Sequence, residues 1–342
     1  MLIPKFRKYI LAVFLALGLM QIWASSGGGQ SQSGLTTLKV LLVPFIGSAP
    51  FFIGEEEGFF AEQGLQIKFI KMVRSADGIP ALTHGELDIW YGSTTTSFLN
   101  VIARGGKIRC VAEKGYLSPT GCAYSALLAR RSLVEEGKLN GPAHLNGRRI
   151  DLNPVSVEAY YVEKLLNTVG LSLNDIVIVD VPTPVMPDAL KKGTIDVVAT
   201  VEPWITFALQ TGHAVLWMPA QKVIPGFQLS TILFGPTLLE KNPEVGKRFM
   251  IACLKAVRQF NKGKTERNLE IIAKHTGLDK ELLKRTCWPS LRDDGKMNIE
   301  SVLDFQSWAV KKGFQDKVVS PDQFWDPSFI EYANKVLNKS VP

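Results

Sequence analysis

ALTHGELDIWYGSTTTS, residues 81–97, is the stretch that decides the fold. It contains a helix end, a glycine at position 85 that suits a helix C-cap, and a short apolar strand from Leu87 to Tyr91. A loop rich in hydroxyl groups follows at residues 92–97, before an apolar helix. A loop of this kind, between the carboxyl end of a strand and a helix N-terminus, is where open α/β sheets bind ligands. Ser and Thr are also ordinary helix N-caps, and the sequence leaves both interpretations open.

The same pattern returns about a hundred residues later. From Ala189 the chain reads ALKKGTIDVVATVEPW, in which Ala189, Leu190, Gly193 and Asp196 match Ala81, Leu82, Gly85 and Asp88 at one constant offset. The neighbouring strand KVLLVP at residues 39–44 has its counterpart in RIDLNP at residues 149–154. Two copies of a β-α-β-α-β unit predict two α/β lobes, each a mixed or parallel sheet flanked by helices.

The order of the predicted elements assigns the chain to these lobes. We expect residues 35–129 in the first lobe, residues 130–227 in the second, and residues 228–342 returning to the first lobe and ending in helices. Within the first lobe, residues 51–63 form one amphipathic helix and residues 108–112 form a strand. Two connections between the lobes would make a hinge.

The N-terminus has the features of an export signal. Lys5, Arg7 and Lys8 precede an apolar run that is short for a membrane span, and small residues follow it. We expect a signal peptide at residues 1–24 and a flexible Gly/Ser/Gln linker at residues 25–34, and therefore a protein that works outside the cytoplasm, in the periplasm or an equivalent space. An uncleaved membrane anchor is the alternative.

Charge and motifs exclude several classes of function. The formal charge of +7 falls to +4 without the three signal-peptide cations (7 − 3), and this excess is scattered, so we expect no nucleic-acid partner. The Gly-Lys-Thr at residues 263–265 lacks the first glycine of a phosphate-binding loop and follows a helix. The four histidines show no metal-ligand spacing, and no nucleophile elbow occurs. We therefore expect no metal, no cofactor and no catalytic residue.

The chain contains four cysteines, which can form disulfides in an exported protein. Cys110 and Cys122 flank a loop with turn residues, so we predict a disulfide between them. Cys253 lies in an apolar helical run, which favours a buried free thiol. Cys287 can pair with any of the others on the sequence alone.

Polar and aromatic residues gather where the predicted strands end. In the first lobe these are the segment from Phe45 to Ala49 and the loop from Ser93 to Thr95, and in the second lobe the loop from Asn153 to Ser156. Arg74 can bind an anion bidentately or be a solvated loop residue. Glu202 can bind an amine or cap the helix that starts at Pro203. Stacking on a planar ligand is open to aromatic residues such as Tyr116 and Trp204.

Four segments of the chain resemble a known family. They are GSAPFFIGEEEGFFAEQGLQIKF (residues 47–69), ALTHGELDI (81–89), ALKKGTIDVVATVEPW (189–204) and STILFGPTLLEKNPEVGKRF (230–249). In these, the chain resembles the nitrate, taurine and sulfonate branch of the periplasmic substrate-binding proteins of ABC transporters, a group that also contains thiamine-precursor binders. The resemblance covers residues 38 to about 260.

The resemblance implies a two-lobed fold of type II, with a cleft that closes on a small molecule and delivers it to a membrane permease. The ligand would be a sulfonate, taurine or nitrate-type anion or a heterocycle like a thiamine precursor, and the protein a monomer. Typical contact positions of the family fall on residues 45–49, 93–95, 153–156 and 202–204. With Arg74 and Tyr116 added from the residues themselves, the predicted ligand-binding set is Phe45, Gly47, Ser48, Ala49, Arg74, Ser93, Thr94, Thr95, Tyr116, Asn153, Ser156, Glu202 and Trp204.

One segment departs from the family pattern. Pro154, Val155 and Ser156 stand where the family often has Gly-Ser-Thr, which weakens the case for an anion at the first loop of the second lobe. Two other functions remain open. An enzyme of pyrimidine synthesis would share the fold but depends on His and Cys clusters that the sequence lacks, and an extracytoplasmic sensory module would be favoured by an uncleaved anchor.

Overall fold

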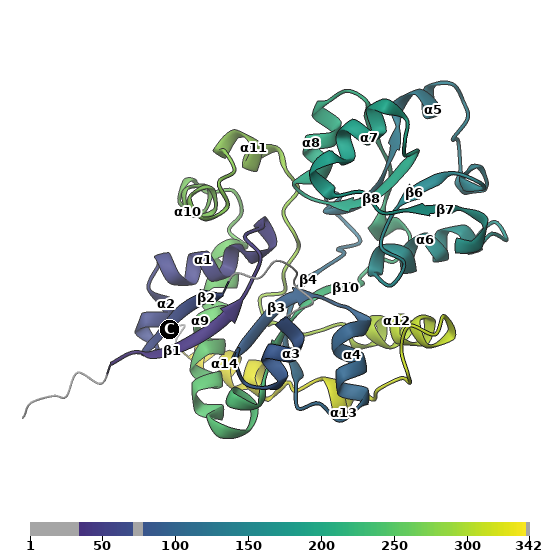
Figure 1. Ribbon diagram of the computed structural model, residues 1–342. Coiled ribbons are helices and arrows are strands. Elements are labelled where there is room, and N and C mark those ends of the chain that lie inside the picture. Colours follow the sequence, from purple (N-terminus) through teal and green to yellow (C-terminus); the bar gives the residue numbers. More distant parts are fainter. Residues whose placement is uncertain (1–33, 71–77, 340–342) are drawn as a thin grey trace, which may run out of the picture. The chain divides into compact units, whose positions relative to one another are not determined.

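The computed structural model of the chain describes residues 34–70 and 78–339. The predicted signal peptide, residues 25–33 of the predicted linker, and Arg74 lie outside the described residues. The described part contains two mixed sheets of five strands, each flanked by helices (Figure 1). The prediction of a two-lobed α/β fold is confirmed, and we call the parts built on these sheets the first and second lobes.

Both sheets have the same mixture of strand directions, although the antiparallel strand next to the parallel ones is the last of its lobe in the first sheet and the first of its lobe in the second. The first sheet runs β2-β1-β3-β10-β4, with β1 parallel to β2 and β3, and with β10 antiparallel to β3 and β4. The second runs β7-β6-β8-β5-β9, with β6 parallel to β7 and β8, and with β5 antiparallel to β8 and β9. The strands are β1 (Thr36–Leu41), β2 (Leu65–Ile70), β3 (Ile89–Ser93), β4 (Arg109–Tyr116), β5 (Ser125–Arg130), β6 (Arg149–Asp151), β7 (Val177–Val179), β8 (Val197–Val201), β9 (Ala214–Pro219) and β10 (Gln228–Phe234).

The repeated aspartates explain why the two sheets match. Asp88 accepts a hydrogen bond from the backbone N–H of Lys39 at 2.8 Å, and its own N–H donates to the Lys39 carbonyl at 3.0 Å. Asp196 makes the same pair of bonds with Arg149, at 3.1 and 2.9 Å. One carboxylate therefore ties β3 to β1 in the first lobe, and another ties β8 to β6 in the second, which fixes the register of the parallel strands.

Helices cover both faces of each sheet. Those before the C-terminal tail are α1 (Ala49–Glu56), α2 (Phe59–Glu62), α3 (Gly78–Thr83), α4 (Thr96–Ala103), α5 (Arg131–Glu135), α6 (Val157–Asn167), α7 (Met186–Lys192) and α8 (Trp204–Gln210). Short 3₁₀ or π turns occupy Ile46–Ser48, Pro142–Leu145, Leu173–Asp175, Thr183–Val185, Ala220–Lys222 and Thr237–Lys241. The tail contains α9 (Pro243–Phe260), α10 (Glu266–Thr276), α11 (Lys280–Arg285), α12 (Ile299–Lys311), α13 (Pro321–Phe324) and α14 (Ser328–Lys339).

The single helix predicted for residues 51–63 is wrong. Gly58 adopts φ +73°, a left-handed conformation that ends α1, and a second short helix starts at Phe59. The break lets Phe60 turn back against Phe51, with ring centroids 6.0 Å apart, and both rings contact Phe249 of α9. Because α9 belongs to the tail, this aromatic cluster holds the tail on the first lobe.

The chain passes between the lobes twice, after β4 and after β9. One hydrophobic cluster includes residues of both lobes, among them Trp90 of β3 and Tyr160 of α6. No helix in the described ranges is apolar enough over sufficient length to span a membrane.

The predicted disulfide between Cys110 and Cys122 is wrong. Cys122, in the first crossover, is bonded to Cys287, 165 residues further along the chain, whereas Cys110 is buried and free. The physical reason is that β4 continues as an extended strand to Tyr116, which carries the chain roughly 20 Å away from Cys110. Cys253 is buried and free, as predicted.

Candidate functional site

Four loops meet at the carboxyl ends of the parallel strands of the two sheets. The turn at Ile46–Ser48 lies beyond β1, and the loop before α4 follows β3. In the second lobe, α6 follows β6 and α8 follows β8. These loops line two adjoining cavities, of about 320 Å³ and about 220 Å³, that share Phe45, Glu158 and Val201. We call the pair the cleft. Its larger cavity is at the lower end of the ordinary range for small-molecule sites, about 300–1,000 Å³.

Most of the predicted ligand-binding residues lie in this cleft. The larger cavity is lined by seven of them, from both lobes, and the smaller adds two. The seven are Phe45, Gly47, Ser93, Thr94, Thr95, Asn153 and Ser156, and the two are Glu202 and Trp204.

Three predicted residues lie elsewhere. Ser48 is buried and donates its hydroxyl to the Val43 carbonyl at 2.6 Å, so it supports the turn after β1. Ala49 is buried at the start of α1 and does not line either cavity. Tyr116 packs its ring against the Arg292 guanidinium, 4.4 Å from the ring centroid, and pairs with Ser290.

In the hydroxyl-rich loop of the first lobe, one hydroxyl group has a structural role and two are available to bind a ligand. Thr94 is buried and donates its hydroxyl to the Gln228 carbonyl at 2.9 Å, joining the loop to β10. Thr95 occupies the N-cap position of α4, yet its side chain makes no capping hydrogen bond. The hydroxyls of Thr95 and of exposed Ser93 therefore face the cavity without a partner among the described residues.

The corresponding loop of the second lobe satisfies its own polar groups. Ser156 caps α6 by accepting the Ala159 N–H at 3.4 Å and donates its hydroxyl to the Asn153 carbonyl at 2.7 Å. The Asn153 side-chain oxygen accepts the Val155 N–H at 3.1 Å. Side-chain donors are thus fewer here than in the first lobe, which agrees with the departure from Gly-Ser-Thr at this loop.

Glu202 is buried, and both of its oxygens are occupied. It accepts the Thr206 N–H at 3.0 Å and the Thr206 hydroxyl at 2.9 Å, in the first turn of α8. It also accepts the Cys287 N–H, at 3.1 Å, from the tail. Burial raises the pKa of Glu202 and outweighs these three donors, which act in the opposite direction. The geometry favours the helix-cap role that the sequence left open.

Two charged residues of the larger cavity were missed from the sequence. Lys114 comes from β4, and Glu158 comes from the first turn of α6. Desolvation lowers the pKa of Lys114 to about 7. The only available signal was a lysine two residues beyond an apolar strand that was expected to end at Ala112.

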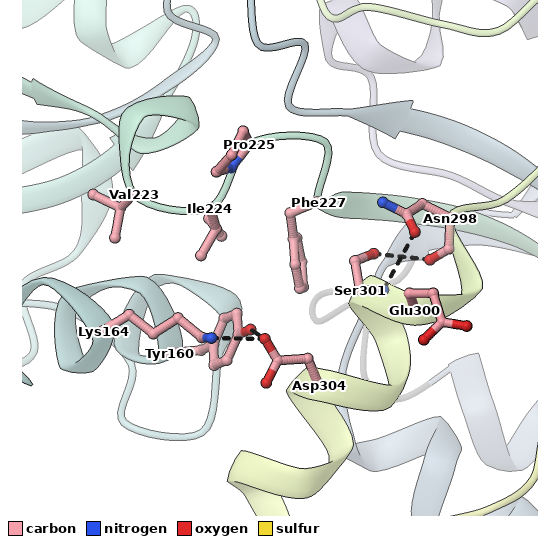
Figure 2. Close-up of a pocket in the computed structure, with 10 residues that line it drawn as sticks. All are labelled: Tyr160, Lys164, Val223, Ile224, Pro225, Phe227, Asn298, Glu300, Ser301 and Asp304. Atoms are coloured by element: carbon pink, nitrogen blue, oxygen red, sulfur yellow. Dashed lines mark hydrogen bonds and ion pairs between the residues drawn. The ribbon is translucent and has the colours of Figure 1, made fainter.

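A further cavity, of about 460 Å³, lies outside the cleft, between α6, the second crossover and α12 (Figure 2). Figure 2 shows that its polar side chains, with the exception of Glu300, already bind one another. Asp304 accepts hydrogen bonds from the Tyr160 hydroxyl and the Lys164 ammonium, both at 2.6 Å. Asn298 is bonded to Ser301 in the same way. With these groups satisfied, the cavity offers fewer available donors than the cleft.

Comparison with known proteins gives one family and many similar folds. A model of the NMT1/THI5-like family matches residues 46–262. No curated protein sequence matches the chain. Within the described residues, no group of three or more His, Cys, Asp or Glu side chains is placed to hold a metal ion.

Three solved structures illustrate the fold. The zinc-bound ligand-binding component of an ABC-type import system from Staphylococcus aureus is 16% identical, with a TM-score of 0.70 over 87% of this chain and 99% of that chain. The periplasmic aliphatic sulphonate-binding protein SsuA from Escherichia coli is 16% identical, with a TM-score of 0.69 over 86% and 99%. The desulfurization enzyme DSZB is 16% identical, with a TM-score of 0.62 over 89% and 99%. At such identities the likeness concerns the fold alone.

Proposed function

The chain belongs to the NMT1/THI5-like family, and on that premise we propose that it is the solute-binding component of an ABC importer. In this role the two lobes clamp a small molecule in the cleft and deliver it to a membrane permease. The structural neighbours include binding components of this kind, such as the Staphylococcus aureus and Escherichia coli proteins.

The observation that carries the proposal is the lining of the larger cavity. Its residues come from the loops after β1, β3 and β6 and from β10, so that a molecule bound there contacts both lobes at once. Strand ends and helix N-termini present backbone N–H groups to such a molecule. A ligand that bridges the lobes stabilises the closed arrangement in proportion to its differential affinity for that state.

We propose that the first lobe provides most of the ligand's polar contacts. Ser93 and Thr95 have available hydroxyls, whereas Thr94, Asn153 and Ser156 contribute shape because their side chains bind within the protein. Phe45 and Trp204 line the smaller cavity and offer aromatic faces to an organic ligand. The ligand proposed is a sulfonate, taurine or nitrate-type anion or a heterocycle like a thiamine precursor.

The remaining parts of the proposal follow from the importer role. The protein acts as a monomer outside the cytoplasm, after export by the N-terminal signal, and its protein partner is the permease. It performs no chemistry on its ligand.

A catalytic function on the same fold is the competing proposal, since DSZB is an enzyme. The described residues that line the cleft include no Cys and no His, the residue types on which the enzyme alternative depends. Incubation with the identified ligand, followed by mass spectrometry of the small molecule, separates the two functions. A binding protein returns it unchanged, and a product would establish an enzyme.

Native mass spectrometry of freshly purified protein tests the binding function itself. We expect a mass excess that disappears on denaturation and corresponds to one small molecule. Thermal shift with sulfonates, nitrate, bicarbonate, dicarboxylates and thiamine precursors should then contain a hit, because a ligand at a hundredfold excess over Kd stabilises the folded state by about 2.7 kcal/mol. A protein with no bound molecule and no hit in the panel would contradict the proposed function.

A further inference from the structure

The larger cavity contains one unpaired charge of each sign. Lys114 from the first lobe and Glu158 from the second are the charged side chains that line it. Neither makes an ion pair or a side-chain hydrogen bond with any residue in the described part of the chain. Elsewhere, lysines and glutamates of this protein are commonly paired, as Lys312 is with the buried Glu163 of α6 at 2.7 Å.

The surroundings of the Lys114 ammonium favour the binding of an anion. It is half-buried, and its ammonium nitrogen lies 4.1 Å from the centroid of the buried Tyr91 ring. The face of an aromatic ring stabilises a cation but does not neutralise it. A partly desolvated ammonium that forms no ion pair is costly in the free protein, and an anionic group in the cavity reduces that cost.

The surroundings of the Glu158 carboxylate favour the binding of a cation. It lines both cavities of the cleft. The smaller cavity also presents the rings of Phe45 and Trp204. A carboxylate beside aromatic faces is the arrangement that proteins use to bind ammonium groups. The same carboxylate repels an anion from the helix N-terminus next to it.

We infer that the ligand is a zwitterion whose acidic group binds at Lys114 and whose protonated nitrogen binds at Glu158. The inference rests on the proposed function and narrows its ligand class. A simple anion such as nitrate would leave Glu158 unpaired in the closed cleft, and a simple amine would leave Lys114 unpaired. A molecule with both groups pairs with the charged side chain of each lobe and thereby stabilises the closed arrangement.

Matched ligand pairs test the inference. The probes are taurine with ethanesulfonate, β-alanine with propanoate, and γ-aminobutyrate with butanoate, measured by calorimetry on the full mature chain. We expect at least one zwitterion to bind about 10- to 100-fold more tightly than its partner without the amine, the range of one charge-assisted hydrogen bond. Glu158→Gln should bring that ratio close to one, and Lys114→Gln should weaken both members of the pair.

Two exposed residues provide control variants. Glu300→Gln and Lys192→Gln remove the same charges outside the cleft and should leave the ratio unchanged. The melting temperature of each unliganded variant shows whether it is folded. Glu158→Asp, which keeps the charge, should retain part of the preference and guards against a fold defect in the Gln variant.

Three results would overturn the inference. One is an anion that binds as tightly as its zwitterion in the wild type, and another is a ratio that survives Glu158→Gln. The third is no binding by any probe. Native mass spectrometry then distinguishes a wrong ligand class from a wrong function. A bound molecule with charge of only one sign refutes the zwitterion alone, whereas the absence of any bound molecule refutes the proposed binding function as well.

Discussion

Glu202→Ala separates a structural role from a ligand-binding role at the cleft. The variant removes an acceptor for three donors, namely the N–H and hydroxyl of Thr206 and the N–H of Cys287. Each buried donor left without a partner costs about 1–3 kcal/mol, and entry of water into the adjoining cavity recovers part of that. We expect a loss of about 3–5 kcal/mol in the free energy of unfolding.

The corresponding fall in Tm is about 5–10 °C, since 1 kcal/mol shifts the Tm of a large domain by about 2 °C. Scanning calorimetry of the unliganded protein measures it, with Glu202→Gln keeping one acceptor and losing less. Glu86→Ala, at an exposed acid, is the matched control and should melt like the wild type. Affinity for the ligand should stay within about threefold in the folded variant. A variant that melts normally but no longer binds would refute the cap and assign Glu202 to the ligand.

Three further outcomes follow from the structure. The double substitution Ser93→Ala and Thr95→Ala should weaken ligand affinity about tenfold and leave the unliganded Tm unchanged. Thr94→Ala should instead lower the Tm, because the Thr94 hydroxyl binds β10. The reverse pattern would contradict the assignment of Thr94 to the fold and of Ser93 and Thr95 to the ligand. Ligand affinity, measured by calorimetry, should be constant well below pH 7 and fall about tenfold per pH unit above it. The reason is that Lys114, with a pKa of about 7, loses the proton that an acidic ligand group requires. Lys114→Arg should flatten this profile. Of the groups around Lys114, Tyr91 and Tyr124 stay neutral there because burial raises their pKa, while Glu113, whose pKa burial raises to about 7, and Glu158 favour the protonated lysine; a flat wild-type profile would refute the assignment. Peptide mapping should find Cys122 linked to Cys287, with Cys110 and Cys253 alkylated only after unfolding; the link should add up to about 5 kcal/mol by the chain-entropy model, and a peptide joining Cys110 to Cys122 would disprove it.

Local patterns were enough to predict the fold. The Gly-to-Asp spacing around Asp88 and Asp196 marks a strand after a helix, and its repetition predicts two similar sheets without any long-range information. The structure gives the reason, since both carboxylates bind the N–H of the first strand of their own sheet. Strand ends then indicated the cleft, because parallel strands end at one edge of a sheet.

Features that depend on pairing between distant segments were not predictable. β4 reaches Tyr116 because β10, more than a hundred residues later, pairs with it, and this extension is what brings Lys114 into the cavity. Glu202 and Cys122 both meet Cys287, which has no sequence signal toward either of them. The edge strand β9 was missed as well, since its six residues are all apolar and show no alternation with polar ones.

A crystal structure of the protein as purified, with its bound molecule, tests the central claim most directly. We expect electron density for one small molecule in the larger cavity of the cleft, in contact with Ser93 or Thr95 on one side and with the N-terminal end of α6 on the other. Density confined to one lobe, or in the cavity between Tyr160 and Asn298, would contradict the claim that the two lobes clamp a ligand between them.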